Sequence, residues 1–245
     1  MPSVFRTLLA LSAAAVSLCA SVAWADEAQI RKNLPERLPK LPAIDEVSKT
    51  PIPGLYEVRI GTDVVYTDEQ GNHIIQGSVV DTRTGTNLTE ERVNKLTAID
   101  FDKLPFADAV MWKKGTGARR IAVFADPNCV YCKRFEQDLQ KISDITVYTF
   151  IIPILGGDSP EKSRNIWCAK EPAKVWLSWM LEGAMPPRSM GQCSSGPIER
   201  NLVLSRKHRV NGTPVIVFAN GTRVPGAMNA EQIEKQLALA SAAKL

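Results

Sequence analysis

The sequence predicts an α/β domain with an open sheet, preceded by a small strand-rich module and a charged helix. In the second half of the chain, the apolar run RRIAVFA is followed by the amphipathic stretch CVYCKRFEQDLQKI and by a second apolar run, ITVYTFIIPI. A strand, a helix and a strand in this order form a βαβ unit, which implies an open α/β sheet. In the first half, short alternating segments separated by turn residues predict an antiparallel sheet.

The N-terminus has the features of an export signal. Arg6 precedes the apolar run LLALSAAAVSLCASV, which is short for a membrane span, and AWA at positions 23–25 fits a signal peptidase site. We therefore expect residues 1–25 to be a cleaved signal peptide, with an uncleaved anchor as the alternative. The leucine before Cys19 is too bulky for a lipoprotein signal, so Cys19 is interpreted as part of the discarded segment. Asp26 then begins the mature protein.

The strand-rich module follows a proline-rich stretch, residues 33–53, which excludes a continuous helix there. LYEVRI alternates apolar and polar residues, and DVVYT and HIIQGSVVD continue the strand pattern on either side of the turn DEQGN. A module of this size is marginal as an independent fold. We expect it to gain a partner surface by self-association along an exposed strand edge.

A connecting helix is predicted next, over Thr89–Lys103, with Asn87 or Thr89 as its N-cap and Pro105 ending it. Its thin apolar stripe and many charges suit a link between two modules. After the βαβ unit, PIERNLVLSRKH and AEQIEKQLALASAA predict helices, and VIVFANGTRVPG predicts a hairpin with a type I′ turn at Asn220-Gly221.

Charge and cysteine content restrict the function. The balance of 30 basic against 26 acidic residues, without a basic run, argues against nucleic-acid binding. Outside the signal, the cysteines are Cys129, Cys132, Cys168 and Cys193. An exported chain meets oxidising conditions that favour disulfides, and a zinc site would favour two closely spaced pairs, so we expect no metal. The histidines, at positions 73 and 208, are interpreted as surface residues.

The CxxC pair itself suits redox chemistry. Asp126-Pro127-Asn128 ends the strand and opens the helix, which places Cys129 at the helix N-terminus and Cys132 one turn inside. Free amides and the positive end of the helix dipole stabilise a thiolate there. We expect Cys129 to be the exposed nucleophile and Cys132 the buried resolving thiol.

The CxxC and the downstream Gly212-Thr213-Pro214 together resemble the thioredoxin fold. The resemblance implies that Pro214 is cis, that Thr213 helps to set the reactivity of Cys129, and that this loop presents backbone to a bound peptide. Most X-Pro bonds are trans, so an ordinary trans proline that begins the strand VIVF is the alternative.

A wider resemblance covers nearly all of the mature chain. YTDEQGNHIIQG, IWCAKEPAK and NGTRVPG are similar to the DsbC and DsbG family of periplasmic disulfide isomerases. That family implies a small α+β (cystatin-like) dimerisation domain over 26–88, a linker helix over 89–105, and a thioredoxin-like catalytic domain with a helical insertion over 106–245. It also implies a homodimer, a structural disulfide between Cys168 and Cys193, and no cofactor. We expect Trp167, Trp176 and Trp179 to pack around that bridge.

The motif departs from both named relatives. Val130-Tyr131 between the cysteines stands where DsbC commonly has Gly-Tyr and DsbG has Pro-Tyr, while FADPNC before the motif is closer to DsbG. The histidine found inside the CxxC of the strongly oxidising DsbA is absent, which predicts a less oxidising couple. The dipeptide, Val130 and Tyr131, is therefore expected to tune reactivity and substrate binding.

The resemblance implies a periplasmic enzyme that isomerises or reduces wrong disulfides in exported proteins, with chaperone activity. The membrane reductase DsbD is the implied electron donor. Three alternatives stay open: a DsbG-like protector of single oxidised cysteines, a holdase chaperone without chemistry, and a net oxidase.

Overall fold

The computed structural model describes residues 18–190 and 192–242, with the backbone alone described over 18–25. The chain divides into two compact units, residues 1–96 and 97–245. Of the expected signal peptide, residues 1–25, the first 17 lie outside the described residues. Helix α1 begins at Leu18. Within the described part, no helix is both long enough and apolar enough to cross a membrane.

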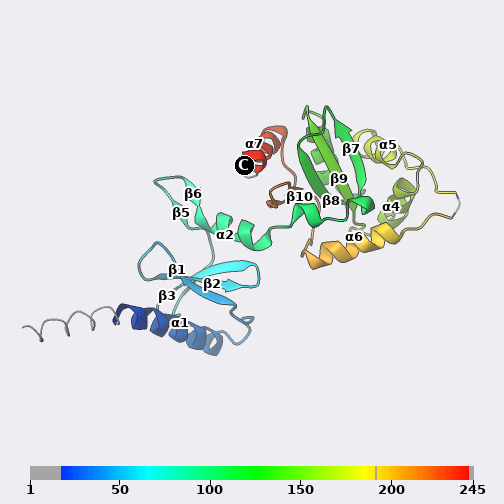
Figure 1. The fold of residues 1–245 in the computed structure, drawn as a ribbon. Helices are drawn as coiled ribbons and strands as arrows, with labels where there is room; N and C mark the ends of the chain where they lie inside the picture. Colours follow the sequence, from blue (N-terminus) through cyan, green and yellow to red (C-terminus); the bar gives the residue numbers. More distant parts are fainter. Residues whose placement is uncertain (1–17, 191, 243–245) are drawn as a thin grey trace, which may run out of the picture. The chain divides into compact units, whose positions relative to one another are not determined.

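The first unit is a helix packed on an antiparallel sheet of order β1-β2-β3-β4 (Figure 1). Ile30 and Leu34 of the helix are buried against Val47, Tyr56 and Val58 of the sheet. Its elements are α1 (Leu18–Arg37), β1 (Glu46–Lys49), β2 (Leu55–Ile60), β3 (Asp63–Asp68), β4 (Ile74–Ile75), and a separate hairpin of β5 (Val80–Asp81) and β6 (Thr86–Asn87). The stretch HIIQGSVVD, expected to add to one sheet, is thus divided between the sheet and the hairpin.

Helix α2 (Leu88–Thr97) is shorter than the sequence predicts. Asn87 Oδ1 accepts from the Glu90 amide at 3.0 Å, which makes Asn87 the N-cap. Beyond Thr97, the Ile99 amide donates to the Gly221 carbonyl at 3.0 Å, and a 3₁₀ turn over Phe101–Lys103 buries Phe101. These tertiary contacts end the helix well before Pro105. The prediction of a helix to Lys103 is therefore wrong in its second half.

Polar contacts attach α2 to the sheet of the first unit. Arg92 pairs with Glu57 at 2.8 Å and with Glu46 at 2.7 Å. The Thr89 hydroxyl lies against the Tyr66 hydroxyl and accepts from the Val79 amide at 2.9 Å. Part of the charge on this helix is thus paired with residues of the first unit.

The second unit is a five-stranded mixed sheet of order β11-β10-β8-β9-β7 with helices on both faces (Figure 1). The central strands β8 and β9 are parallel, as a βαβ unit requires, and the outer pairings are antiparallel. The strands are β7 (Val110–Lys114), β8 (Arg120–Ala125), β9 (Ile145–Ile151), β10 (Val215–Phe218) and β11 (Arg223–Pro225). The helices are α3 (Val130–Leu139), α4 (Ser159–Trp167), α5 (Pro172–Leu177), α6 (Gly196–Lys207) and α7 (Ala230–Ala242), with a second 3₁₀ turn at Phe106–Asp108 and a π-helical turn at Ser178–Glu182.

Two buried clusters hold these layers together. On one face of the sheet, Phe135 of α3, Trp176 of α5 and Ile233 of α7 share a core. On the other face, Phe124 and Phe150 of the central strands pack with the 3₁₀ turns and partly buried residues of α6. Since β8 is covered on both sides, its continuous apolar sequence is the one that a central parallel strand needs.

The β10–β11 hairpin differs in detail from its prediction. Gly221 has φ 87°, whereas Asn220 has no positive φ, so the turn is not type I′. The Gly221 amide donates to the Phe218 carbonyl at 2.9 Å, which leaves Ala219 and Asn220 as the central turn residues. A turn followed by a glycine in the left-handed region forms a bulged hairpin.

Candidate active site

The CxxC motif lies where β8 ends and α3 begins. Cys129 is the N-cap of α3, and its Sγ accepts from the Cys132 amide at 3.2 Å. An N-cap side chain normally uses oxygen to satisfy one of the free amides at a helix start. Here a sulfur takes that place, so the thiol of Cys129 faces the positive end of the helix.

The loop that contains Thr213 and Pro214 lies against this sulfur. The Thr213–Pro214 peptide bond is cis, and in the dithiol form the Cys129 thiol donates to the Thr213 carbonyl at 3.2 Å. These contacts leave Cys129 only 4% exposed. The expectation of an exposed nucleophile is therefore wrong for this form, because the Thr213 loop covers the sulfur. Cys132, at 1% exposed, is buried as expected.

The two thiols have opposite acidities. The pKa of Cys129 is lowered from 9.0 to about 6, mainly by the neighbouring Cys132 thiol and also by the Thr213 side chain and the amides of Cys132 and Tyr131, all of which stabilise its thiolate. Burial opposes this shift. The pKa of Cys132 is raised far above its ordinary value by burial and by the neighbouring Cys129 sulfur. At neutral pH the pair thus holds one thiolate, on Cys129, and one thiol.

The dipeptide between the cysteines is the most exposed part of the motif. Val130 is 75% exposed and Tyr131 is 65% exposed. Ile154 and Leu155, which follow β9, are large apolar residues that are also exposed, and their amides are tied to the same loop through Asp126. The CxxC loop and the segment fixed to it thus carry four exposed side chains with large apolar surfaces.

Asp126 is a buried residue whose role the sequence reasoning missed. Its Oδ1 accepts from the Asn128 amide and the Ser159 hydroxyl, both at 2.7 Å. Its Oδ2 accepts from the amides of Ile154 at 2.8 Å and Leu155 at 2.9 Å. With both oxygens satisfied, this carboxylate fixes the CxxC loop to the segment that follows β9. These partners are far along the chain, so no local pattern could reveal them.

Trp179 was expected to pack around the second cysteine pair, but it contacts the CxxC loop. Its indole N–H donates to the Pro127 carbonyl at 2.6 Å. The ammonium groups of Lys133 and Lys162 lie 3.9 Å and 4.2 Å from the centroid of its ring, within cation–π range. Lys162 also donates to Asn128 Oδ1 at 2.9 Å. The helical insertion therefore supports the reactive loop directly.

Glu136 lies one helical turn after Cys132 and is fully enclosed. Its Oε1 accepts from the indole N–H of Trp176 at 2.7 Å, whereas Oε2 has no hydrogen-bond partner among the described residues. Burial raises the pKa of this carboxyl to about 7, against the opposing effect of the Trp176 hydrogen bond. Cys132 and Glu136 share the α3 face that packs into the core.

This carboxyl should make stability depend on pH. Because its pKa is higher in the folded state, the folded protein binds the proton more tightly, and stability falls as pH rises from about 4.5 to about 7. Over that range, we expect the free energy of unfolding of wild type to fall by about 3 kcal/mol relative to that of Glu136→Gln, which mimics the protonated acid. Urea unfolding followed by tryptophan fluorescence measures this difference.

The exposed Glu182 gives a matched control, since Glu182→Gln should follow the wild-type pH profile. If the free energy of unfolding had the same slope against pH in wild type and in Glu136→Gln, the carboxyl would already be ionised in the folded state over this range.

The remaining cysteines are joined. Cys168 and Cys193 form a disulfide that closes a separation of 25 residues. Trp176, also expected near this bridge, is fully buried against α3, and Trp167 packs partly on the same core. Among the described residues, no group of three or more His, Cys, Asp or Glu side chains could hold a metal ion.

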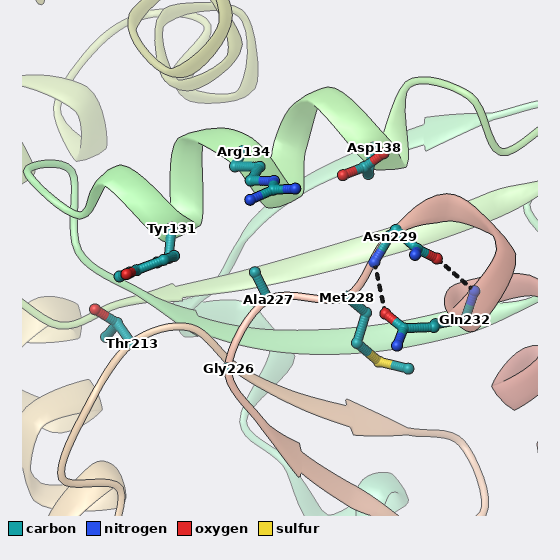
Figure 2. A pocket seen from close by; sticks show the side chains of 9 residues that line it. All are labelled: Tyr131, Arg134, Asp138, Thr213, Gly226, Ala227, Met228, Asn229 and Gln232. Atoms are coloured by element: carbon teal, nitrogen blue, oxygen red, sulfur yellow. Dashed lines mark hydrogen bonds between the residues drawn. The ribbon is translucent and has the colours of Figure 1, made fainter.

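A cavity of 380 Å³, here named the side cavity, opens next to the motif (Figure 2). Tyr131, Arg134 and Asp138 of α3 form one wall. Thr213, the segment 226–229 and Gln232 form the rest.

Two family models match the chain. The thioredoxin-like domain model matches residues 106–241, and the model of the disulfide bond isomerase protein N-terminal domain matches residues 21–90. These matches cover the two units in the order that the sequence predicts. The fold prediction, a thioredoxin-like domain after a small N-terminal domain of the DsbC type, is confirmed.

Individual relatives belong to the same family as the matching models. The chain is 46% identical over 194 residues to the "Probable thiol:disulfide interchange protein DsbC" of Bordetella parapertussis, covering 79% of this chain and 68% of the relative. It is 29% identical over 223 residues to the thiol:disulfide interchange protein DsbC of Escherichia coli, covering 88% and 89%. A crystal structure of a disulfide interchange protein from Neisseria gonorrhoeae superposes with a TM-score of 0.52 at 34% identity, over 56% of this chain and 98% of that one.

Proposed function

The chain belongs to the DsbC family of thiol:disulfide interchange proteins, and from this premise we propose that it isomerises or reduces wrong disulfides in exported proteins. As a family member it is a thiol-disulfide oxidoreductase. The observation that carries the proposal is the arrangement of two thiols in one motif: Cys129 caps α3 and accepts from the Cys132 amide, while Cys132 is buried in the core. Cys129 has a pKa of about 6, while the pKa of Cys132, buried behind it, is raised.

The first step is attack by Cys129. Its thiolate forms a bond to one sulfur of a substrate disulfide, the substrate S–S bond breaks, and the other substrate sulfur leaves as a thiolate. The Thr213 carbonyl, which loses its donor when Cys129 ionises, becomes free to accept from a substrate amide. A peptide held there is positioned for exchange with Cys129.

The mixed disulfide can resolve in two ways. A second substrate thiolate can attack the substrate sulfur, which releases Cys129 and leaves a rearranged disulfide. Alternatively, Cys132 loses its proton and attacks the Cys129 sulfur, which reduces the substrate and oxidises the CxxC pair. The raised pKa of Cys132 disfavours the second route while no base removes its proton. The burial of Cys132 supports isomerisation as the main route of the proposal, and the reductive route needs an external dithiol donor such as the membrane reductase DsbD.

We place the protein in the periplasm as a homodimer joined through its N-terminal domain. The order of the N-terminal sheet supports the homodimer, because it leaves β1 and β4 as edge strands on which a second chain could pair. The cluster of Ile30, Leu34, Val47, Tyr56 and Val58 is also a small core for an independent fold. The exposed Val130, Tyr131, Ile154 and Leu155 would bind unfolded clients and so support chaperone activity.

The redox state inside cells tests the direction of the proposed reaction. Acid quench, thiol alkylation and mass spectrometry should find Cys129 and Cys132 largely reduced while Cys168 and Cys193 remain joined. The bridge serves as an internal control for oxidation during handling. A largely oxidised CxxC pair would identify a disulfide donor and overturn the isomerase assignment.

A further inference from the structure

The side cavity lies within reach of a residue that flanks the target cysteine of a substrate. Thr213 lines it, and the carbonyl of the same residue contacts the Cys129 sulfur. Tyr131, from within the CxxC motif, forms the wall beside Thr213 (Figure 2). A peptide whose cysteine is joined to Cys129 would therefore place a neighbouring side chain at the mouth of this cavity.

Two side-chain amides, of Asn229 and Gln232, lie in the far wall of the cavity beside Ala227 and Met228. Asn229 Oδ1 accepts from the Gln232 amide at 2.9 Å, and Gln232 Oε1 accepts from the Asn229 amide at 3.0 Å (Figure 2). These reciprocal bonds fix the orientation of both side-chain amides, because a backbone N–H requires the oxygen. The NH₂ groups of Asn229 and Gln232 are left as donors.

The charged side chains in the cavity lining are Arg134 and Asp138. Arg134 is exposed on α3 beside the cavity and forms no ion pair with any residue of the described chain. The carboxylate in the same lining, Asp138, is largely buried and pairs with Lys141 at 2.7 Å. The guanidinium of Arg134 is therefore the uncompensated charge, with two amide donors across from it.

We propose that the side cavity is a specificity pocket that takes an acidic side chain, Asp or Glu, next to the target cysteine of a substrate. This proposal rests on the proposed function, since the occupant is part of the disulfide-bearing chain. A carboxylate gains charge-assisted hydrogen bonds from Arg134 and from the amides of Asn229 and Gln232. A basic side chain would meet the Arg134 charge, and an apolar one would leave all three donors without a partner.

Short peptides test this preference in the full-length Cys132→Ala variant. Each peptide carries one cysteine as a neutral 2-thiopyridyl disulfide, flanked by Glu, Gln or Lys on one side and Ala on the other, in both orders. Attack by Cys129 forms the mixed disulfide and releases pyridine-2-thione, whose absorbance gives the rate constant. Reaction of the same peptides with glutathione corrects for the effect of each flanking charge on the disulfide itself.

We expect the corrected rate constant for a Glu peptide to exceed that for its Gln and Lys counterparts by about three- to tenfold in at least one order, as suits a partly exposed charged pair. Arg134→Gln should abolish this ratio while the Gln peptide reacts as before. Arg188→Gln removes an equal charge at a different cavity and should preserve the ratio.

Equal rates for all peptides, or a preference for Lys or Gln, would overturn the pocket while leaving thiol exchange intact. A Glu preference that survives Arg134→Gln would also overturn it. If no peptide reacts faster than with a Cys129→Ser variant, the proposed function itself fails. The two failures are thus distinguishable.

Discussion

Replacing Cys129 by Ser is expected to reduce the refolding of a protein with scrambled disulfides to the rate seen without catalyst. The hydroxyl keeps the N-cap position of α3 but cannot form the mixed disulfide. Recovery of activity of a scrambled, disulfide-rich client in a redox buffer measures the loss. Refolding at the wild-type rate would exclude Cys129 as the nucleophile.

Cys132→Ala is the matched variant, because it removes the other sulfur of the motif and keeps the Cys129 sulfur, whose pKa rises when the Cys132 thiol no longer donates to it. Mixed disulfides with clients should then accumulate and appear on a non-reducing gel, since the intramolecular escape is lost. Cys129→Ser should trap none. The same Cys129→Ser protein should still suppress aggregation of a cysteine-free client if Val130 and its exposed apolar neighbours bind unfolded chains.

Removing the second cysteine pair is expected to have the largest effect on stability. In the chain-entropy description, a crosslink across a separation of 25 residues stabilises the folded state by about 3.5 kcal/mol. Cys168→Ala combined with Cys193→Ala should lower the free energy of unfolding by about that amount. Denaturant unfolding of the catalytic unit, followed by tryptophan fluorescence, provides the measurement.

Each single variant is less suitable, because it leaves a free thiol that can exchange with the CxxC. The double variant should retain Cys129 reactivity, because neither cysteine contacts the motif. A loss of less than about 1 kcal/mol would show that the unfolded chain is not restrained by this bridge.

Much of the fold could be predicted because its signals are local. The apolar run of β8, the amphipathic α3 and the run of β9 are contiguous in sequence, and their order alone implies the parallel pair. Strand β7 was missed, since the apolar signal of this short edge strand is limited to Val110 and Trp112 on its buried face. Helix α2 was predicted too long because its ending depends on a bond from Ile99 to Gly221 in a distant hairpin.

The candidate site also combines features that local sequence predicts with features that depend on the tertiary fold. The position of Cys129 at the start of α3 follows from the residues immediately before it. Its acidity depends on Cys132 and Tyr131, which follow it in the same helix, and on Thr213, which is far along the chain. The anchoring of the loop by Asp126 depends on Ile154, Leu155 and Ser159, which only the tertiary fold brings near. The coverage of Cys129 by the Thr213 loop is likewise a long-range contact, so its burial had no local signal.

The pH dependence of alkylation at each cysteine shows whether Cys129 is the acidic nucleophile and Cys132 the buried thiol. The reduced protein is treated with limiting iodoacetamide between pH 4 and pH 10, and peptide mass spectrometry separates Cys129 from Cys132. We expect the Cys129 rate to rise through a midpoint near pH 6 and then to level, while Cys132 stays unreactive. A Cys129 rate that keeps rising towards pH 9, or earlier modification of Cys132, would contradict this expectation.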